Sequence, residues 1–434
     1  MRHLLVVSHF FPPMGGGGVQ RITKFVKSLE AHGWRATIVA GRPEDYWMRD
    51  DTLAGDVPGS ARVLRIAGAS GIGVLRRVRP SGVGPRRSSR LFGGLRRAAS
   101  WFLVPDTYIG WRPFALGAAR AALENDPADA LLSTGPPETN HLVARTLRQA
   151  TGLPWVADFR DPWFGLHLHP APTPWHRSRH ARYERAVLSE PDAVLATTAW
   201  LADLLRSRAP HSQRIELVRN GYDPADFAGA APPPPSPESP LRLVHTGMLT
   251  LTRSAEGLFR ALAMLRAERP DLDRAFEVDL VGARESRNDA LWSALGLGDR
   301  VRFRDYVPHA EAIAAMRAAD VLVLIKHVEP RFRGLIPGKL YEYMGAGRPI
   351  LALVPESEAA DIVRDLGWGE VVPPDDPPAI ASALVRLLEH KRSGGLSSVY
   401  PCRGRERFER PEQARALAAL LDEIVTARAS KRVR

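Results

Sequence analysis

The feature that most limits the fold of this chain is a repeated alternation of short apolar runs with amphipathic helical patterns. The apolar runs are predicted to be strands. The first series covers residues 4–10, 36–40, 63–66, 130–134, 155–159, 193–197 and 216–219. The second series covers residues 241–246, 276–281, 301–303, 321–325, 350–354 and 370–372. Alternation of this kind predicts parallel sheets covered by helices on both faces.

A proline-rich stretch separates the two series. Residues 228–240 read AGAAPPPPSPESP, and such a run can continue neither a helix nor a central strand, so we predict a linker. The 434 residues then divide into a first domain over 1–227, a second over 241–405 and a C-terminal helical segment over 406–434. We expect two doubly wound, Rossmann-like α/β domains facing an interdomain cleft, with ligands at the carboxyl ends of the strands.

The sequence IPGKLYEYMGAGRPIL, residues 336–351, predicts a short helix with an anion site at its start. Gly338 follows a proline where unpaired N–H groups and the helix dipole attract phosphate, and Lys339 adds a full charge. Glu342 comes one turn later, and its carboxylate can accept hydrogen bonds from ribose hydroxyls. We predict that Gly338 and Lys339 bind the diphosphate of a nucleotide and that Glu342 binds its ribose. A surface Lys–Glu pair is the alternative.

Arg253 is predicted to meet the same diphosphate from the opposite side. It follows the strand over 241–246 and a Thr-Gly-Met-Leu turn, and with Ser254 it is expected to open the next helix. Two cations would offset most of the charge of a diphosphate.

Four consecutive glycines, Gly15, Gly16, Gly17 and Gly18, follow the first strand and precede a helix. They let the backbone approach a ligand closely, and Arg21 can add a positive charge, so we predict an acceptor- or phosphate-binding loop. The spacing is not GxGxxG followed by an acid, which argues against a dinucleotide site. A turn with a purely structural role is the alternative.

Three charged residues, Asp158, Arg160 and Asp161, stand at the end of the predicted fifth strand. Charges at the carboxyl end of a strand face the ligand, so we predict a catalytic role in which Asp161 or Asp158 orients an acceptor hydroxyl. An internal ion pair between Arg160 and one aspartate is the alternative. His141, in the first turns of the helix after the fourth strand, is a further catalytic candidate, with a capped or simply buried imidazole as the alternative.

The net charge of +12 comes mostly from arginine, since only six of the 60 basic residues are lysines, a bias typical of GC-rich genomes. Eight arginines and no acid lie between Arg76 and Arg97, directly before Trp101 and Phe102. This combination fits an anionic membrane surface, where each charge contributes on the order of 1 kcal/mol, or else a flexible solvated loop. No nucleic-acid partner is expected, because no strand face interleaves basic and aromatic residues.

Other classes of site are limited by the sequence. The single cysteine, Cys402, excludes an intrachain disulfide and a cysteine-ligated cluster. No eighteen apolar residues occur together and the N-terminal apolar run is short, so we expect a cytoplasmic protein without a membrane span. If the arginine cluster binds lipid, the protein would be peripheral on the inner face of the membrane. Asp271-Leu272-Asp273 matches a D-x-D pattern seen in some divalent-metal sites, but it sits at the amino end of a strand and is predicted to be a solvated turn. We expect no metal.

Together the motifs resemble those of family-4 glycosyltransferases of the GT-B fold. They are FFPPMGGGGVQR, STGPPETNH, WVADFRDPW, NGYD, HTGMLTLTRS and PGKLYEYMGAGRPIL, and they extend over nearly the whole chain. The resemblance implies a retaining transferase that moves a sugar from a nucleotide diphosphate sugar, usually without a metal. It also implies an acceptor on the first domain, the donor on the second, and a last helix that crosses back onto the first domain. We favour UDP over GDP as the carrier and expect no cofactor.

Two positions depart from the family's pattern. Relatives often carry two glutamates separated by seven residues, and here Gly334 stands at the first position while Glu342 keeps the second. Many relatives also have histidine where this chain has Arg160, which will not act as a base near neutral pH. Such enzymes are thought to work largely by stabilising the leaving diphosphate, so the contact to the transferred sugar is left unassigned.

Three functions are compatible with these features. The first, our working hypothesis, is transfer of a sugar to a polysaccharide, glycolipid or lipid-linked acceptor. The second is the same chemistry on a soluble small molecule such as a secondary metabolite. The third is a non-catalytic protein that binds a nucleotide sugar or a nucleic acid.

Overall fold

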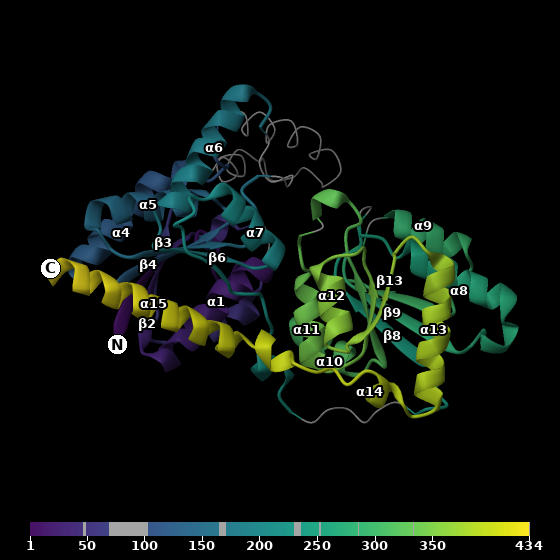
Figure 1. Ribbon diagram of the computed structural model, residues 1–434. Coiled ribbons are helices and arrows are strands. Elements are labelled where there is room, and N and C mark those ends of the chain that lie inside the picture. Colours follow the sequence, from purple (N-terminus) through teal and green to yellow (C-terminus); the bar gives the residue numbers. More distant parts are fainter. Residues whose placement is uncertain are drawn as a thin grey trace. The chain divides into compact units, whose positions relative to one another are not determined.

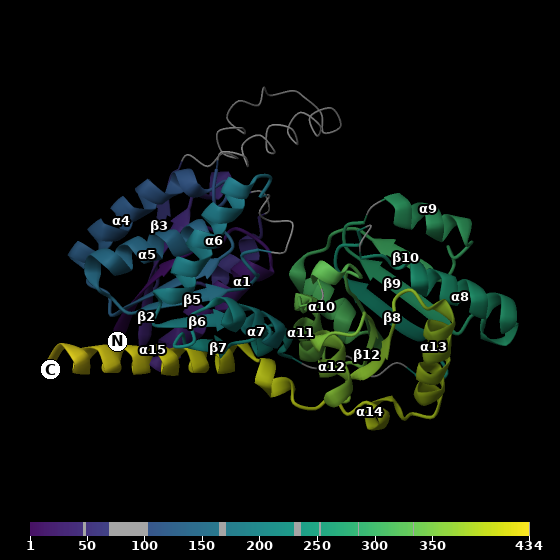
Figure 2. The same ribbon diagram turned by 45° about the horizontal axis from the view of Figure 1, so that its top comes forward.

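The computed structural model describes residues 1–46, 49–68, 103–164, 171–229, 236–250, 253–284, 286–332 and 334–433. The chain forms two compact units, Met1–Arg219 with Arg410–Arg434, and Asn220–Glu409, drawn from two directions in Figure 1 and Figure 2. The arginine cluster over 76–97, the aromatic pair over 101–102 and the proline run over 231–235 lie outside the described residues.

The first unit is built on a seven-stranded parallel sheet in the order β3-β2-β1-β4-β5-β6-β7. The residues from Leu4 to Val7, in the inner strand β1, are 0% exposed because helices cover both faces. The predicted parallel α/β fold is confirmed. The strands are β1 (Arg2–Val7), β2 (Trp34–Gly41), β3 (Arg62–Ile66), β4 (Ala130–Gly135), β5 (Trp155–Phe159), β6 (Ala193–Ala196) and β7 (Ile215–Leu217).

Helices cover this sheet from both sides. One face is packed by α4 (Arg112–Asn125), α5 (Thr139–Thr151), α6 (Pro174–Ser189) and α7 (Ala199–Arg208). The other face is packed by α1 (Gly17–Leu29) and by the last helix, α15 (Arg410–Val433), which lies beside α1. The yellow helix in Figure 1 is α15, and its apolar residues belong to the core of the first unit.

The second unit repeats the plan with a six-stranded parallel sheet in the order β10-β9-β8-β11-β12-β13. Its strands are β8 (Leu241–Thr246), β9 (Phe276–Val281), β10 (Val301–Arg304), β11 (Val321–Ile325), β12 (Ile350–Leu353) and β13 (Gly369–Val372). One face is packed by α8 (Glu256–Glu268), α9 (Ser286–Ala294), α13 (Pro377–Arg392) and α14 (Leu396–Val399). The other face is packed by α10 (His309–Arg317), α11 (Gly338–Ala346) and α12 (Glu358–Asp365).

The boundary between the units differs from the predicted one. The first unit ends at Arg219 instead of residue 227, and the second extends to Glu409 instead of residue 405. The reason is Tyr222, which packs into the second unit: its N–H donates to Phe408 O over 2.9 Å, and its hydroxyl donates to Glu409 Oε1 over 3.1 Å. A local turn signal could not reveal this pairing with a distant segment.

In both sheets the strand order reverses beside the first strand. The reversal falls between β1 and β4 in the first unit and between β8 and β11 in the second. Ligands of doubly wound sheets bind outside the carboxyl ends of the strands at such a switch point. In each unit, a ligand is therefore expected at the carboxyl ends of these two neighbouring strands.

Candidate functional site

Helix α11 begins where the sequence predicts an anion site. Pro337 is extended (φ −58°, ψ 131°) and precedes Gly338, and no described side chain caps the start of the helix. The space beside the Gly338 Cα is open, so a ligand can approach the first N–H groups of the helix. The helix ends at Gly347, whose φ of 67° is the left-handed conformation that favours glycine.

Lys339 and Glu342 lie together on α11, as their spacing predicts. Lys339 Nζ donates to Glu342 Oε2 over 2.5 Å, and the two side chains are 30% and 14% exposed. Both charges are thus held at the start of the helix and remain open to solvent. Their binding roles stay predictions.

Arg253 lies in the turn after β8 and not in the first turn of a helix as predicted, because α8 starts only at Glu256. Thr250 N–H donates to Arg253 O over 3.0 Å, and Arg253 N–H donates to Thr250 O over 3.2 Å, which closes the turn. The guanidinium is partly buried, and this burial lowers its pKa. Within the described ranges no carboxylate pairs with it, and its buried Nε has no acceptor. A buried cation in this state is suited to receive an anionic ligand.

Two histidines surround Arg253 and were not predicted as site residues. His327, after β11, has its Nε2 3.0 Å from Arg253 Nη2. His245, in β8, donates from Nδ1 to Val323 O over 2.8 Å, since a carbonyl can only accept. Burial lowers the pKa of His245 to about 4, against the opposing effect of the Val323 hydrogen bond and with smaller contributions from the charges of Arg253 and Lys339, so its ring is neutral at pH 7.

Lys326 is a third residue that was not predicted. It directly follows β11 and is 2% exposed, and burial lowers its pKa to about 8. One sequence signal could have predicted Lys326 and the two histidines. It is a polar residue at the carboxyl end of an apolar strand, as in LRLVHT and VLVLIKH.

At the carboxyl edge of the first unit, Asp158 and Arg21 form a buried ion pair. Arg21 Nη2 lies 2.9 Å from Asp158 Oδ1, and the two side chains are 0% and 1% exposed. Thr134 Oγ1 donates to Asp158 Oδ2 over 2.8 Å, and Arg21 Nη1 donates to Arg219 O over 2.8 Å. Burial acts to raise the pKa of Asp158, but the Arg21 charge and the hydrogen bonds outweigh it and hold that pKa below its usual range. The predicted ligand-facing roles of Arg21 and Asp158 are therefore corrected to internal ones.

Arg160 spans the space between the glycine run and the end of β4. Its Nε donates to Gly135 O over 2.9 Å, and its Nη2 donates to Pro136 O. Burial, partly offset by Asp161 and Asp158, lowers the pKa of the guanidinium. Arg160 is therefore held by hydrogen bonds to carbonyl oxygens and not by the predicted alternative, an ion pair with an aspartate.

Two of the four glycines are required by the fold itself. Gly16 has a φ of 108°, where a side chain would be strained, and a Cβ at Gly18 would fall on the Arg160 guanidinium. A Cβ at Gly17 would meet nothing within 4 Å. The fold therefore explains the glycine at two positions of the run, and the binding of an acceptor by this loop stays a prediction.

His141 and Asp161 complete the predicted residues of this edge. His141 is 1% exposed, its Nδ1 lies 2.8 Å from Ser133 Oγ, and its ring stacks on Phe159 at 4.7 Å. Burial lowers its pKa to about 4, so the ring is neutral at pH 7. Asp161 lies just beyond β5 and is partly exposed, whereas Asp158 is buried, and the role of Asp161 toward an acceptor stays a prediction.

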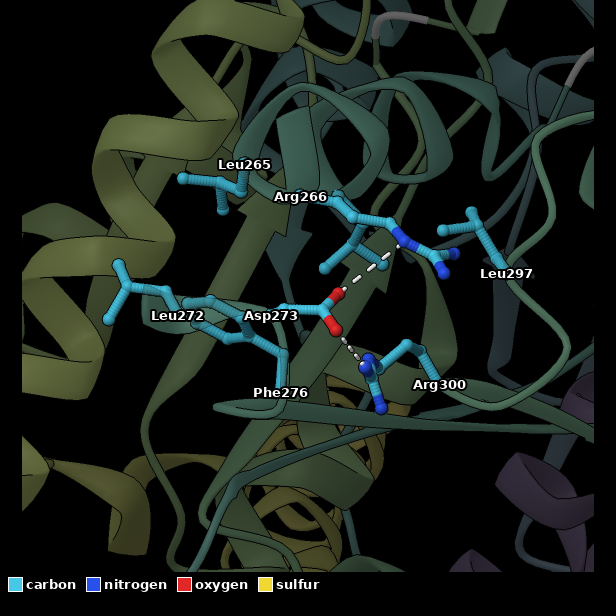
Figure 3. Close-up of a pocket in the computed structure, with 8 residues that line it drawn as sticks. Leu265, Arg266, Leu272, Asp273, Phe276, Leu297 and Arg300 are labelled. Carbon is cyan, nitrogen blue, oxygen red and sulfur yellow. Dashed lines mark hydrogen bonds and ion pairs between the residues drawn. The ribbon is translucent and has the colours of Figure 1, made fainter. Parts of the chain in front are cut away.

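A small cavity in the second unit lies at the opposite edge of the sheet (Figure 3). It holds about 10 Å³, room for about one water molecule. Asp273 points into it and pairs with Arg300 at 2.6 Å, while Asp271 pairs with Arg269 at 2.7 Å. Both aspartates of the D-x-D pattern thus pair with arginines. They lie near Phe276, the first residue of β9, away from the carboxyl edge of the sheet.

Two family models match the chain. A glycosyl transferase 4-like domain matches residues 16–221, and the model of glycosyl transferases group 1 matches residues 240–390. The matches therefore fall one on each half of the chain.

Curated relatives are similar over part of the chain. A D-inositol 3-phosphate glycosyltransferase of Streptomyces coelicolor is 29% identical over 227 residues, which is 46% of this chain and 48% of the relative. A phosphatidyl-myo-inositol mannosyltransferase of Mycolicibacterium smegmatis is 30% identical over 211 residues, which is 48% of this chain and 51% of the relative. The chain thus spans about half the length of the curated relatives it matches.

Solved structures share the fold over nearly the full length. Sucrose-phosphate synthase from Thermosynechococcus elongatus has a TM-score of 0.67 at 19% identity, covering 98% of this chain and 100% of that one. HepE from Anabaena in complex with UDP has a TM-score of 0.61 at 14% identity, with the same coverage. At these identities the likeness concerns the fold alone.

Proposed function

The chain belongs to the family-4 type of GT-B glycosyltransferases, and we propose that it moves a sugar, with retention and without a metal, from a nucleotide diphosphate sugar to a hydroxyl group. The observation that carries the proposal is the set of anion-binding groups at one edge of the second unit. There, the uncapped start of α11, Lys339 and the carboxylate-free Arg253 follow strands that meet at the switch point. A diphosphate supplies the negative charge that Arg253 and the start of α11 lack.

In the proposed donor site, each of these groups binds a different part of the nucleotide or binds it from a different side. Gly338 and Lys339 bind the diphosphate from one side, Arg253 binds it from the other, and Glu342 accepts hydrogen bonds from the ribose. HepE, which shares the fold, is described in complex with UDP, and UDP is the carrier we propose here. When the sugar leaves, negative charge grows on the diphosphate, and fixed cations stabilise that state more than the ground state.

The acceptor half concerns the first unit. We propose that Asp161 orients the acceptor hydroxyl, since it is partly exposed at the carboxyl end of β5 while Asp158 is fully engaged. The curated relatives are named for an inositol phosphate and a phosphatidylinositol acceptor. For this chain we propose a polysaccharide, glycolipid or lipid-linked acceptor, with a soluble small molecule as the second candidate.

The test of the donor site is a thermal-shift screen with UDP, GDP, ADP and dTDP. We expect UDP to raise the melting temperature, because binding to the folded state alone adds about 2.7 kcal/mol of stability at a hundredfold excess over Kd. A protein that none of the four diphosphates stabilises would not be a nucleotide-sugar transferase.

The Glu342→Ala variant is the specificity arm of that screen. The wild type is expected to bind UDP more tightly than 2′-deoxy-UDP, and the variant is expected to bind UDP less tightly and to lose the discrimination, because the ribose acceptor is gone. Glu311→Ala, an exposed glutamate on α10, serves as the matched control and should behave like the wild type.

Helix α6 carries the observation that favours a membrane-bound acceptor. Trp175 is 56% exposed, Arg182 and Arg185 further along the helix are exposed, and the Arg179 guanidinium lies 5.7 Å from the Trp175 ring centroid. Glu184, the single acid of the helix, is 6% exposed and so does not face solvent. A basic face with an aromatic residue suits the surface of an anionic bilayer. Across the described ranges no helix is both long and apolar enough to cross a membrane.

Vesicle sedimentation distinguishes the two classes of acceptor. The doubly substituted Arg182→Glu/Arg185→Glu variant is expected to bind phosphatidylglycerol vesicles at least about tenfold more weakly than the wild type, since each arginine near the surface contributes about 1 kcal/mol. Arg206→Glu, on the exposed side of α7, is the control. If neither the double variant nor deletion of residues 76–97 lowers the bound fraction, the soluble acceptor is favoured.

A further inference from the structure

We propose that His327 is a positioning residue that orients the Arg253 guanidinium for the diphosphate without neutralising it. The inference rests on the proposed nucleotide-sugar site of the second unit. His327 lies outside the sequence motifs named above.

One hydrogen bond defines the pair. Arg253 Nη2 lies 3.0 Å from His327 Nε2. A guanidinium can only donate, so Nε2 must accept and carries no proton in this arrangement. Arg253 follows β8 and His327 follows β11, which are paired neighbours at the switch point of the sheet. The bond therefore joins the two connecting segments that flank the proposed diphosphate site.

The His327 ring is itself held in place. It packs against Phe332 with ring centroids 4.4 Å apart and an interplanar angle of 33°, and Phe332 is 5% exposed. The backbone turns tightly around Phe332, whose N–H donates to Glu329 O over 2.9 Å and whose carbonyl accepts from Leu335 N–H over 3.0 Å. This segment leads directly into Pro337 and α11. The same stretch of chain thus fixes both the imidazole and the helix start that binds phosphate.

The choice of an imidazole has an electrostatic reason. A carboxylate in the same place would form a charge-assisted pair with Arg253 and cancel the charge that a diphosphate needs. A neutral imidazole fixes one N–H direction and leaves the positive charge and the remaining N–H groups for the ligand. Arg253 Nε is one such group, since it is buried without an acceptor among the described residues. His245, the other ring near Arg253, is neutral at pH 7 and adds no charge beside the guanidinium.

The test compares three substitutions, His327→Ala, His327→Gln and His327→Glu, by calorimetric titration with UDP. Alanine removes the acceptor and should weaken UDP binding about tenfold, the loss of one hydrogen bond to a charged group. Glutamine supplies an amide oxygen near the position of Nε2 and should restore binding to within about twofold of the wild type. Glutamate also supplies an acceptor but neutralises Arg253, and it should bind UDP more weakly than the alanine variant.

The order of UDP affinities among the three variants distinguishes a loss of Arg253 orientation from a general loss of structure. Melting temperatures without ligand should agree among the variants, so a loss of folding cannot produce the expected order of affinities. Equal UDP affinity of the alanine variant and the wild type, or of the glutamate and glutamine variants, would overturn the inference alone. A wild type that binds neither UDP nor the other three diphosphates would overturn the proposed function together with it.

Discussion

Replacing Arg253 with alanine is expected to lower kcat/KM for the nucleotide sugar by about 10²–10³-fold, the usual loss when a preorganised donor to a developing charge is removed. Arg253 is the cation of this edge without a described carboxylate partner, whereas Lys339 is paired with Glu342 at 2.5 Å. The effect should appear largely in kcat, because the leaving diphosphate carries more negative charge than the bound donor. Steady-state kinetics with the diphosphate sugar identified by the nucleotide screen measures it.

Two further variants define what Arg253 contributes. Arg253→Lys keeps the charge but loses the planar fork of donors, so it should recover part of the activity and not all of it. Arg260→Ala is the matched control, since Arg260 lies in α8, is exposed and pairs with Glu256 in the same helix at 2.8 Å. An Arg253→Ala enzyme that turns over at the rate of the Arg260→Ala enzyme would remove Arg253 from the donor site.

Replacing Arg21 with alanine is expected to destabilise the first unit by about 3–5 kcal/mol, because it leaves the Asp158 carboxylate buried and uncompensated. Asp158 would keep the hydrogen bond from Thr134 and lose the three contacts from Arg21. Urea denaturation followed by tryptophan fluorescence measures the change, since the buried Trp34, Trp111 and Trp155 report on this unit.

The double variant Arg21→Ala/Asp158→Ala is the informative control. It removes both charges, so it should be less destabilised than the sum of the single changes. Arg206→Ala, which breaks a pair with Asp203 whose side chains are 52% and 75% exposed, should change stability by less than about 1 kcal/mol. Additive effects of Arg21→Ala and Asp158→Ala would mean that the two residues do not act as a pair.

Local sequence patterns predict the strands of this chain well. Residues 241–246 and 321–325 were predicted as strands and are β8 and β11 with the same limits. The reason is that strands covered on both faces must be apolar along their whole length, which makes them visible without knowledge of their neighbours. The α11 site is predictable for a similar reason, since its helix start, Lys339 and Glu342 lie within one short segment.

Contacts between distant segments could not be predicted in the same way. Arg21 and Asp158 are 137 residues apart in the chain, and Arg253 and His327 are 74 residues apart. Each residue taken alone has several plausible partners, and only the packing of strands and helices selects one. This is why Arg21 was expected to face a ligand, and why His327 was not singled out.

The place of α15 has a consequence for how the protein is made. Its Ala414, Leu417 and Leu421 are 0% exposed in the core of the first unit, although the 190 residues of Asn220–Glu409 precede them in the chain. At about 5–20 residues per second, a ribosome needs about 10–40 s to synthesise that stretch. During this time α1 is already present, but the apolar residues of the same face that α15 covers in the folded protein lack that cover. The nascent chain is therefore expected to be prone to aggregation until α15 has been synthesised.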